Sequence, residues 1–206
     1  MTNQIFPTKG NLIKTKKSLD LSRMGHELLD RKRNILVREM MLLMNDANEI
    51  QLQIDAAYKK AYEALQQSNI SLGFCDNIAQ AVPVEQNVSL SYRSVMGVEL
   101  PTVMLAAPPP AMHYGFDASN SLLDEAYISF HEVKILTARL AEVENCVYRL
   151  AFAIKKTQKR VGALKNIMIP RFEGAVKFIA DALEEKDREE FSRLKVIKSK
   201  KNQQED

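Results

Sequence analysis

The chain has 206 residues, of which 46% are hydrophobic and 27% are charged, with 7 Gly, 7 Pro and no Trp. This composition is typical of a helix-rich soluble protein and argues against a compact domain of several layers. The most apolar window, residues 103–112, is too short to span a bilayer and contains three prolines, so we expect a cytoplasmic protein without direct membrane insertion.

The net charge of +3 conceals a segregation along the chain. Residues 1–45 hold 9 Lys or Arg against 4 Asp or Glu, residues 46–145 hold 5 against 13, and residues 146–206 hold 15 against 9, which gives balances of +5, −8 and +6. If the two ends pair antiparallel, both basic segments meet at one end of a rod and the acidic segment lies at the other. Such a rod could engage a different partner at each end, although long solvated helices also carry many charges without such a role.

The first element that the sequence predicts is a long helix. Pro7 and Gly10 oppose an early helix start, Asn11 is a candidate N-cap, and the helix is expected over residues 12–67. Together, residues 1–67 are predicted to be an N-terminal coiled-coil arm. Gly25 lies inside this arm, and His26 and Arg33 occupy positions where the apolar repeat calls for hydrophobic residues. Polar residues at such positions often fix the register of a coiled coil at some cost in stability.

Residues 68–120 are predicted to be a middle region of different character. The run from Ser68 to Gly73 breaks the helical pattern, and hydrophobic residues then alternate at a period of two over residues 87–105, on both sides of Gly97. This pattern predicts a short β-hairpin in which Pro101 ends the second strand or confines it to an edge. A Pro-rich linker with little regular structure is expected between the hairpin and residue 121.

The second long helix is expected over residues 121–198 and forms a C-terminal coiled-coil arm, followed by a frayed tail over residues 199–206. Pro170 lies inside its apolar repeat, and because proline removes a backbone hydrogen bond and clashes with the preceding turn, we expect a local bend there.

Both arms carry apolar residues at a heptad spacing, which keeps one stripe facing a partner helix over many turns. We therefore predict a mainly α fold, a long antiparallel two-helix coiled coil made by the N- and C-terminal arms, with a small middle region that contains the hairpin. The predicted seam residues are Leu36, Met40, Leu43, Ile50, Ile54, Leu140, Val143, Val147, Leu150, Ile154, Val161 and Leu164.

Motifs for catalysis and for cofactors are missing from the sequence. It has no Gly-rich phosphate loop, no His-Glu-x-x-His helix and no Cys-x-x-Cys pair, so we expect no catalytic residue, no cofactor and no metal site. Cys75 and Cys146 are interpreted as buried or idle thiols, and His26 as a structural residue. Basic clusters could bind nucleic acid, but no aromatic residues interleave with them, so a solvated or protein-facing surface is favoured.

Several motifs together carry a family resemblance. Pro7-Thr8-Lys9 and the run Gly25 to Arg33 in the N-terminal arm, and Lys156 to Leu164, Ile169-Pro170 and Glu184 to Phe191 in the C-terminal arm, resemble the D subunit of V-type and archaeal-type rotary ATPases. The resemblance covers nearly the whole chain. Gly162 departs from the family pattern, which usually has Asn there, and should loosen the helix locally by up to about 1 kcal/mol relative to Ala.

The resemblance implies a non-catalytic rotor shaft that couples ATP hydrolysis or synthesis to H⁺ or Na⁺ movement, on the cytoplasmic side of the membrane as a peripheral part of a membrane-bound complex. Its implied partners are the A and B subunits of a catalytic hexamer, the F subunit, and the subunit of C/d type that caps the membrane ring. Exposed cations suit a turning contact because their attraction is weak and long-ranged. The predicted hexamer contacts are Lys155, Lys156, Lys159, Arg160 and Lys165.

Two other interpretations share this layout. A coiled-coil scaffold or adaptor would tolerate the same heptads without transmitting torque. The γ axle of F-type synthases has the same arm arrangement, but it normally places a sizeable α/β domain between its arms, and residues 68–120 are too few for one.

Overall fold

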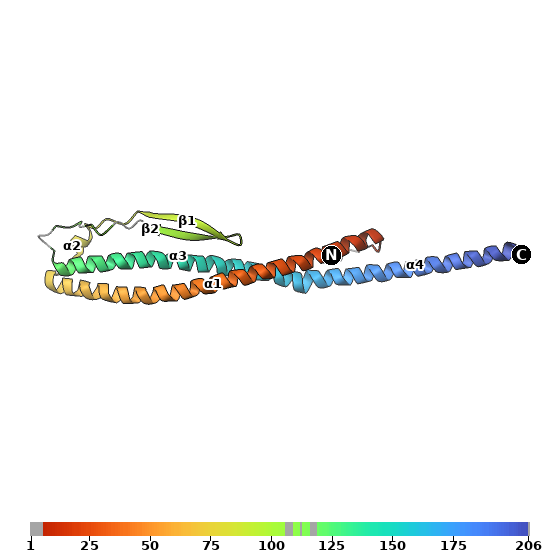
Figure 1. The fold of residues 1–206 in the computed structure, drawn as a ribbon, viewed down its shortest axis with the longest axis horizontal. Coiled ribbons are helices and arrows are strands. Elements are labelled where there is room, and N and C mark those ends of the chain that lie inside the picture. Colours follow the sequence, from red (N-terminus) through yellow and green to blue (C-terminus); the bar gives the residue numbers. More distant parts are fainter. Residues whose placement is uncertain (1–5, 106–108, 112, 116–118, 206) are drawn as a thin grey trace. The chain divides into compact units, whose positions relative to one another are not determined.

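The computed structural model describes residues 6–105, 109–111, 113–115 and 119–205, with side chains described through residue 200. Two long helical segments account for most of the chain (Figure 1). In chain order the elements are α1 (Lys9–Leu72), α2 (Asp76–Ala79), β1 (Val88–Val95), β2 (Val98–Leu105), α3 (Ser121–Ala163), the π-helical turn η2 (Leu164–Met168) and α4 (Ile169–Glu205). The expected fold class is confirmed: the protein is mainly helical, its N- and C-terminal helices pack together, and a small antiparallel hairpin lies between them in sequence.

The chain forms two compact units, and α1 and α3 contribute residues to both. Unit 1 comprises Met1–Arg33 and Lys156–Asp206, and unit 2 comprises Asn34–Lys155.

Within unit 1 the two chain segments run in opposite directions. Lys9 forms an ion pair with Asp187 at 4.0 Å, and Arg23 forms one with Glu173 at 2.6 Å. Further along, Gly25 lies beside the side chain of Leu164. Residue numbers therefore rise on one helix as they fall on the other, which is the antiparallel pairing that the heptads predict.

Unit 2 pairs its helices in the same sense. The amide of Asn120, just before α3, donates a hydrogen bond to Ser71 near the end of α1. The rings of Tyr62 and Phe130 meet edge to face with their centroids 5.5 Å apart. The hydrophobic core of this unit is a cluster of four buried residues contributed by both helices and the hairpin, namely Leu36, Leu100, Cys146 and Leu150.

The hairpin has a two-residue turn and a regular register. Val95 pairs with Val98, and the turn residues Met96 and Gly97 both have positive φ, at 51° and 75°, as a type I′ turn requires. Because residues next to a two-residue turn form a hydrogen-bonded pair and the pattern then alternates, Pro101 falls at a position whose peptide group points away from β1. Its missing N–H therefore costs no ladder bond, so β2 continues to Leu105 instead of ending at Pro101.

Helix α1 begins earlier and ends later than the 12–67 predicted. The Oγ1 atom of Thr8 accepts a hydrogen bond from the N–H of Asn11 at 3.2 Å, so Thr8 caps the helix and the expected cap at Asn11 was wrong. The predicted break at Ser68 was also wrong, because Ser68 is fully buried within the helix. The helix ends at Leu72. Gly73 follows it with a φ of +82°, and the N–H of Gly73 donates a hydrogen bond to the carbonyl of Asn69.

The C-terminal arm contains a π-helical turn where the sequence predicts a bend. The N–H of Ile169 bonds to the carbonyl of Leu164, five residues earlier, directly before Pro170. Pro170 thus occupies the first turn of α4, where its missing N–H is tolerated. The α4 helix then continues to Glu205, past residue 198, because the last residues are mainly Lys, Gln and Glu, which favour helix.

Candidate functional site

The predicted seam residues are either buried or half-buried. Leu36, Ile54, Leu150 and Val161 are buried, and the other eight are half-buried. The polar residues in the same repeat, His26 and Arg33, are also half-buried, and Arg33 is paired with Asp30 at 2.8 Å one turn earlier. Burial at a spacing of seven is what knobs-into-holes packing of two helices requires.

The five predicted hexamer contacts are exposed. Lys155 is the last residue of unit 2, while Lys156, Lys159, Arg160 and Lys165 belong to unit 1. On α3, the buried Thr157 and Val161 face the partner helix, so the cations between them in sequence lie on the solvent side.

The sequence around these five cations is exclusively positive in its charged residues. Residues 145–172 contain seven Lys or Arg and no Asp or Glu. Among the residues that the structure describes, no carboxylate forms an ion pair with any of the five predicted contacts.

The hairpin is held against α3 by three polar contacts along one edge of β2. The guanidinium of Arg149 donates to the Glu99 carbonyl at 3.1 Å, and the Cys146 thiol donates to the Pro101 carbonyl at 3.2 Å. The N–H of Val103 donates to the carboxylate of Glu142 at 3.0 Å. Because residues 142, 146 and 149 lie on one helical face, α3 covers the outer edge of β2.

Side chains add to this attachment. Arg149 also lies over the ring of Tyr92, at 5.6 Å from its centroid, and Arg93 forms an ion pair with Glu39 of α1 at 3.0 Å. Burial raises the pKa of the Cys146 thiol, so it stays protonated and can donate its hydrogen bond. The hairpin is thus fixed to both helices of unit 2.

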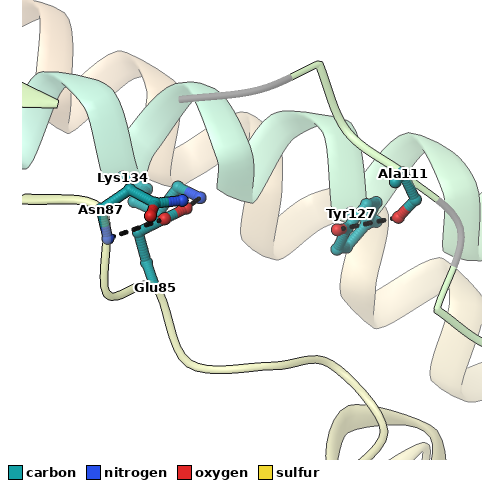
Figure 2. A network of polar contacts seen from close by, with 5 residues as sticks. All are labelled: Glu85, Asn87, Ala111, Tyr127 and Lys134. Atoms are coloured by element: carbon teal, nitrogen blue, oxygen red, sulfur yellow. Dashed lines mark hydrogen bonds and ion pairs between the residues drawn. The ribbon is translucent and has the colours of Figure 1, made fainter. Parts of the chain in front are cut away.

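A pocket of about 680 Å³ lies beside α3 in unit 2, lined by the segments before and after the hairpin. Figure 2 shows its polar contacts: Lys134 is paired with Glu85 at 2.8 Å, and the Tyr127 hydroxyl donates to the Ala111 carbonyl at 3.2 Å. The bonds from Lys134 and from the Asn87 N–H lower the pKa of Glu85 below its ordinary value. These contacts tie both connecting segments to α3.

Hydrophobic side chains are strongly exposed in the last turn of α1, in the turn before α2 and in the segment that follows α2. Ile70 is 81% exposed, Phe74 93% and Val84 86%. Ile70 and Phe74 line the same surface hollow, together with Tyr62 and Leu65.

The described residues offer neither a metal site nor a membrane span. Within that part of the chain, no group of three His, Cys, Asp or Glu side chains could hold a metal ion. The described helices include none that is long and apolar enough to cross a membrane.

Comparisons with known proteins identify the family. The family model described as the D subunit of ATP synthase matches residues 11–199. The chain belongs to this family. It is 40% identical over 198 residues to the V-type ATP synthase D subunit of Thermotoga neapolitana, covering 95% of this chain and 98% of that protein. It is 35% identical to the A-type ATP synthase D subunit of Pyrococcus furiosus over 201 residues, covering 95% and 94%, and 36% identical to that of Thermococcus kodakarensis over 200 residues, again covering 95% and 94%.

For this member of the D-subunit family, a small hairpin is expected to lean on the helices or on a partner, but sequence reasoning did not identify the residues of α3 that hold it. Glu142, Cys146 and Arg149 have ordinary spacing for one helical face, but nothing local indicates that their partners are main-chain groups about 40 to 50 residues away.

Proposed function

We propose that this chain is the non-catalytic central shaft of a V/A-type ATPase or ATP synthase, coupling chemistry in a hexamer of A and B subunits to proton or sodium translocation by rotation. The observation that carries the proposal is the antiparallel packing of the N- and C-terminal helices in each unit, in a chain that belongs to the D-subunit family along nearly its whole length. Two helices that are locked together resist bending and twisting better than one, and torque requires that resistance.

The arrangement of surfaces supports an assignment of partners. The cationic face around Lys159 would contact the A and B subunits, where weak and exchangeable ion pairs let the shaft pass from one site to the next. The exposed hydrophobic residues Ile70, Phe74 and Val84 in the acidic middle segment would dock on the ring-capping subunit of C/d type, with the F subunit bound alongside. The protein would then be peripheral, on the cytoplasmic side of the membrane.

Irregularities in the shaft would serve its mechanism. A shaft with identical faces would present the same surface to every catalytic interface, so asymmetry is needed for the sites to differ. The π-helical turn before Pro170, Gly162, and the polar residues His26 and Arg33 supply uneven surfaces in unit 1. We infer that these features help to set the conformations of the surrounding sites.

Co-purification tests the assignment against a scaffold without a rotary role. Affinity-tagged full-length chain, expressed in its own cells, should retain A- and B-type ATPase subunits in a complex that hydrolyses ATP. A scaffold would instead retain proteins without ATPase activity, and that result would overturn the proposal. Nucleic acid is not expected to be retained at moderate salt.

A further inference from the structure

The two edges of the hairpin differ in what covers them. The outward peptide groups of β2 at Glu99, Pro101 and Val103 are all engaged by side chains of α3. On β1 the ladder to β2 uses the peptide groups of Ser89, Ser91, Arg93 and Val95, so those of Val88, Leu90, Tyr92 and Ser94 point the other way. Among the residues that the structure describes, no main-chain hydrogen bond reaches this second edge.

The free edge of β1 has few of the features with which proteins protect exposed strands, and its one charged residue is Arg93, which is paired with Glu39 of α1. It is eight residues long and contains no Pro, no Lys and no bulge. Three of its hydrophobic residues are more than half exposed: Val88 is 52% exposed, Leu90 59%, and Tyr92 57% although Arg149 lies over its ring. In Figure 1, β2 lies between β1 and α3.

We propose that the free edge of β1 is a docking site for an extended segment of another subunit of the same ATPase, which adds a third strand to the hairpin. Main-chain hydrogen bonds to residues 88, 90, 92 and 94 would supply affinity. Selectivity would come from hydrophobic residues at alternate positions of the added strand, placed beside Val88, Leu90 and Tyr92 on one face of the sheet.

Charge and size identify the occupant. Residues 46–145 carry a balance of −8, so a segment flanked by Lys or Arg is attracted and a second copy of this acidic region is repelled. The surface that one eight-residue edge can bury is also far smaller than the roughly 1,200–2,000 Å² that a stable protein–protein interface buries. The added strand therefore belongs to a subunit that is already held in the complex by other contacts, which raise its effective concentration at this edge.

The inference goes beyond the shaft role, because it requires assembly with other subunits but no torque. Residue-resolved amide hydrogen exchange, compared between the isolated full chain and the assembled ATPase, tests it. The outward N–H groups of Leu90, Tyr92 and Ser94 should slow by at least about ten-fold on assembly, while those of Ser89, Ser91 and Arg93 change little. Equal slowing of all six groups would indicate simple coverage and overturn the proposal, as would no change. Slowing in the isolated chain that grows with its concentration would identify a second copy as the occupant and overturn the choice of partner.

A matched pair of variants isolates the main-chain bond. Leu90→Pro removes an outward N–H opposite Val103, and the native Pro101 shows that this hairpin tolerates proline at an outward position. Leu90→Ala shortens the same side chain and keeps the N–H. Leu90→Pro should abolish the alternating protection in the assembled complex while Ser89 and Ser91 remain protected, and Leu90→Ala should preserve the alternation. If both variants retain the alternating protection, no strand is added to β1. The shaft role is tested separately by ATP-driven rotation, so failure of the strand proposal is distinguishable from failure of the shaft role.

Discussion

Leu36 of α1 and Leu150 of α3 are both 0% exposed and belong to the same buried cluster, which joins the two arms of the chain beside the hairpin. The contact connects residues from opposite thirds of the sequence. The hairpin residue Leu100 packs in the same cluster and is its third fully buried leucine.

Truncation of the Leu150 side chain in this cluster should destabilise unit 2 strongly. Leu150→Ala removes buried methyl groups and leaves a cavity, which costs about 2–5 kcal/mol of the free energy of unfolding. Chemical denaturation of the full chain, followed by circular dichroism, measures the change. Leu42→Ala is the matched control, because Leu42 is 61% exposed on α1 and its truncation should cost no more than about 0.5 kcal/mol. Equal losses in the two variants would refute the assigned core.

Removing cations from the exposed face should weaken assembly. The triple variant Lys156→Ala, Lys159→Ala and Arg160→Ala loses three weak attractions of roughly 0.2–1 kcal/mol each, so its affinity for the A and B subunits should fall by about ten-fold and depend less on salt. Titration at low and moderate salt measures both effects.

The control for this variant removes the same charge elsewhere. Lys59, Lys60 and Arg139 are exposed residues of unit 2, and their joint replacement by Ala should leave the affinity for the hexamer unchanged. If both triple variants assemble as the parent does, the face around Lys159 is not the contact.

Replacement by alanine should change the free energy of unfolding in opposite directions at Gly162 and at Gly73. Gly162 lies inside α3 with nothing within 4 Å of the position that a Cβ would take, so Gly162→Ala should raise the free energy of unfolding by about 0.5–1 kcal/mol. Gly73→Ala should lower it, because Gly73 has a φ of +82° that alanine adopts only with strain. Thermal melts of both variants check the signs, and stabilisation by Gly73→Ala would contradict the assigned helix end.

The Glu85–Lys134 pair should make the attachment of residues 82–87 sensitive to acid. Because the folded-state pKa of Glu85 lies below its ordinary value of 4.5, the contribution of the pair is present above about pH 4.5 and is lost as pH falls through the folded-state pKa. Carbon-detected NMR titration of the Glu85 carboxyl should give a pKa below 4.5, and Lys134→Met should move it upward. An unchanged pKa in the variant would show that Lys134 is not its main cause.

The features that the sequence predicts well are those set by local periodicity. The heptad spacing that includes Leu36, Ile54 and Val161 predicts which helix faces become buried, because helical geometry alone brings every seventh residue to one side. The alternation around Gly97 likewise predicts the hairpin, since the turn needs a residue that accepts positive φ.

The features that depend on distant contacts or on competition between similar signals were not predictable. Thr8 and Asn11 are both good cap residues, and only the structure shows that Thr8 is used. Pro101 looks like a strand breaker until the register shows that its peptide group faces outward. The cationic face is visible in the sequence, but which protein it contacts depends on a partner surface that lies outside this chain.

Single-molecule rotation tests the central claim most directly. A bead attached through Asp76→Cys in α2, on full-length chain assembled with the immobilised catalytic hexamer, should turn in one direction in discrete steps when ATP is added. If the same complexes hydrolyse ATP while the bead shows no directional rotation, the chain is not the shaft.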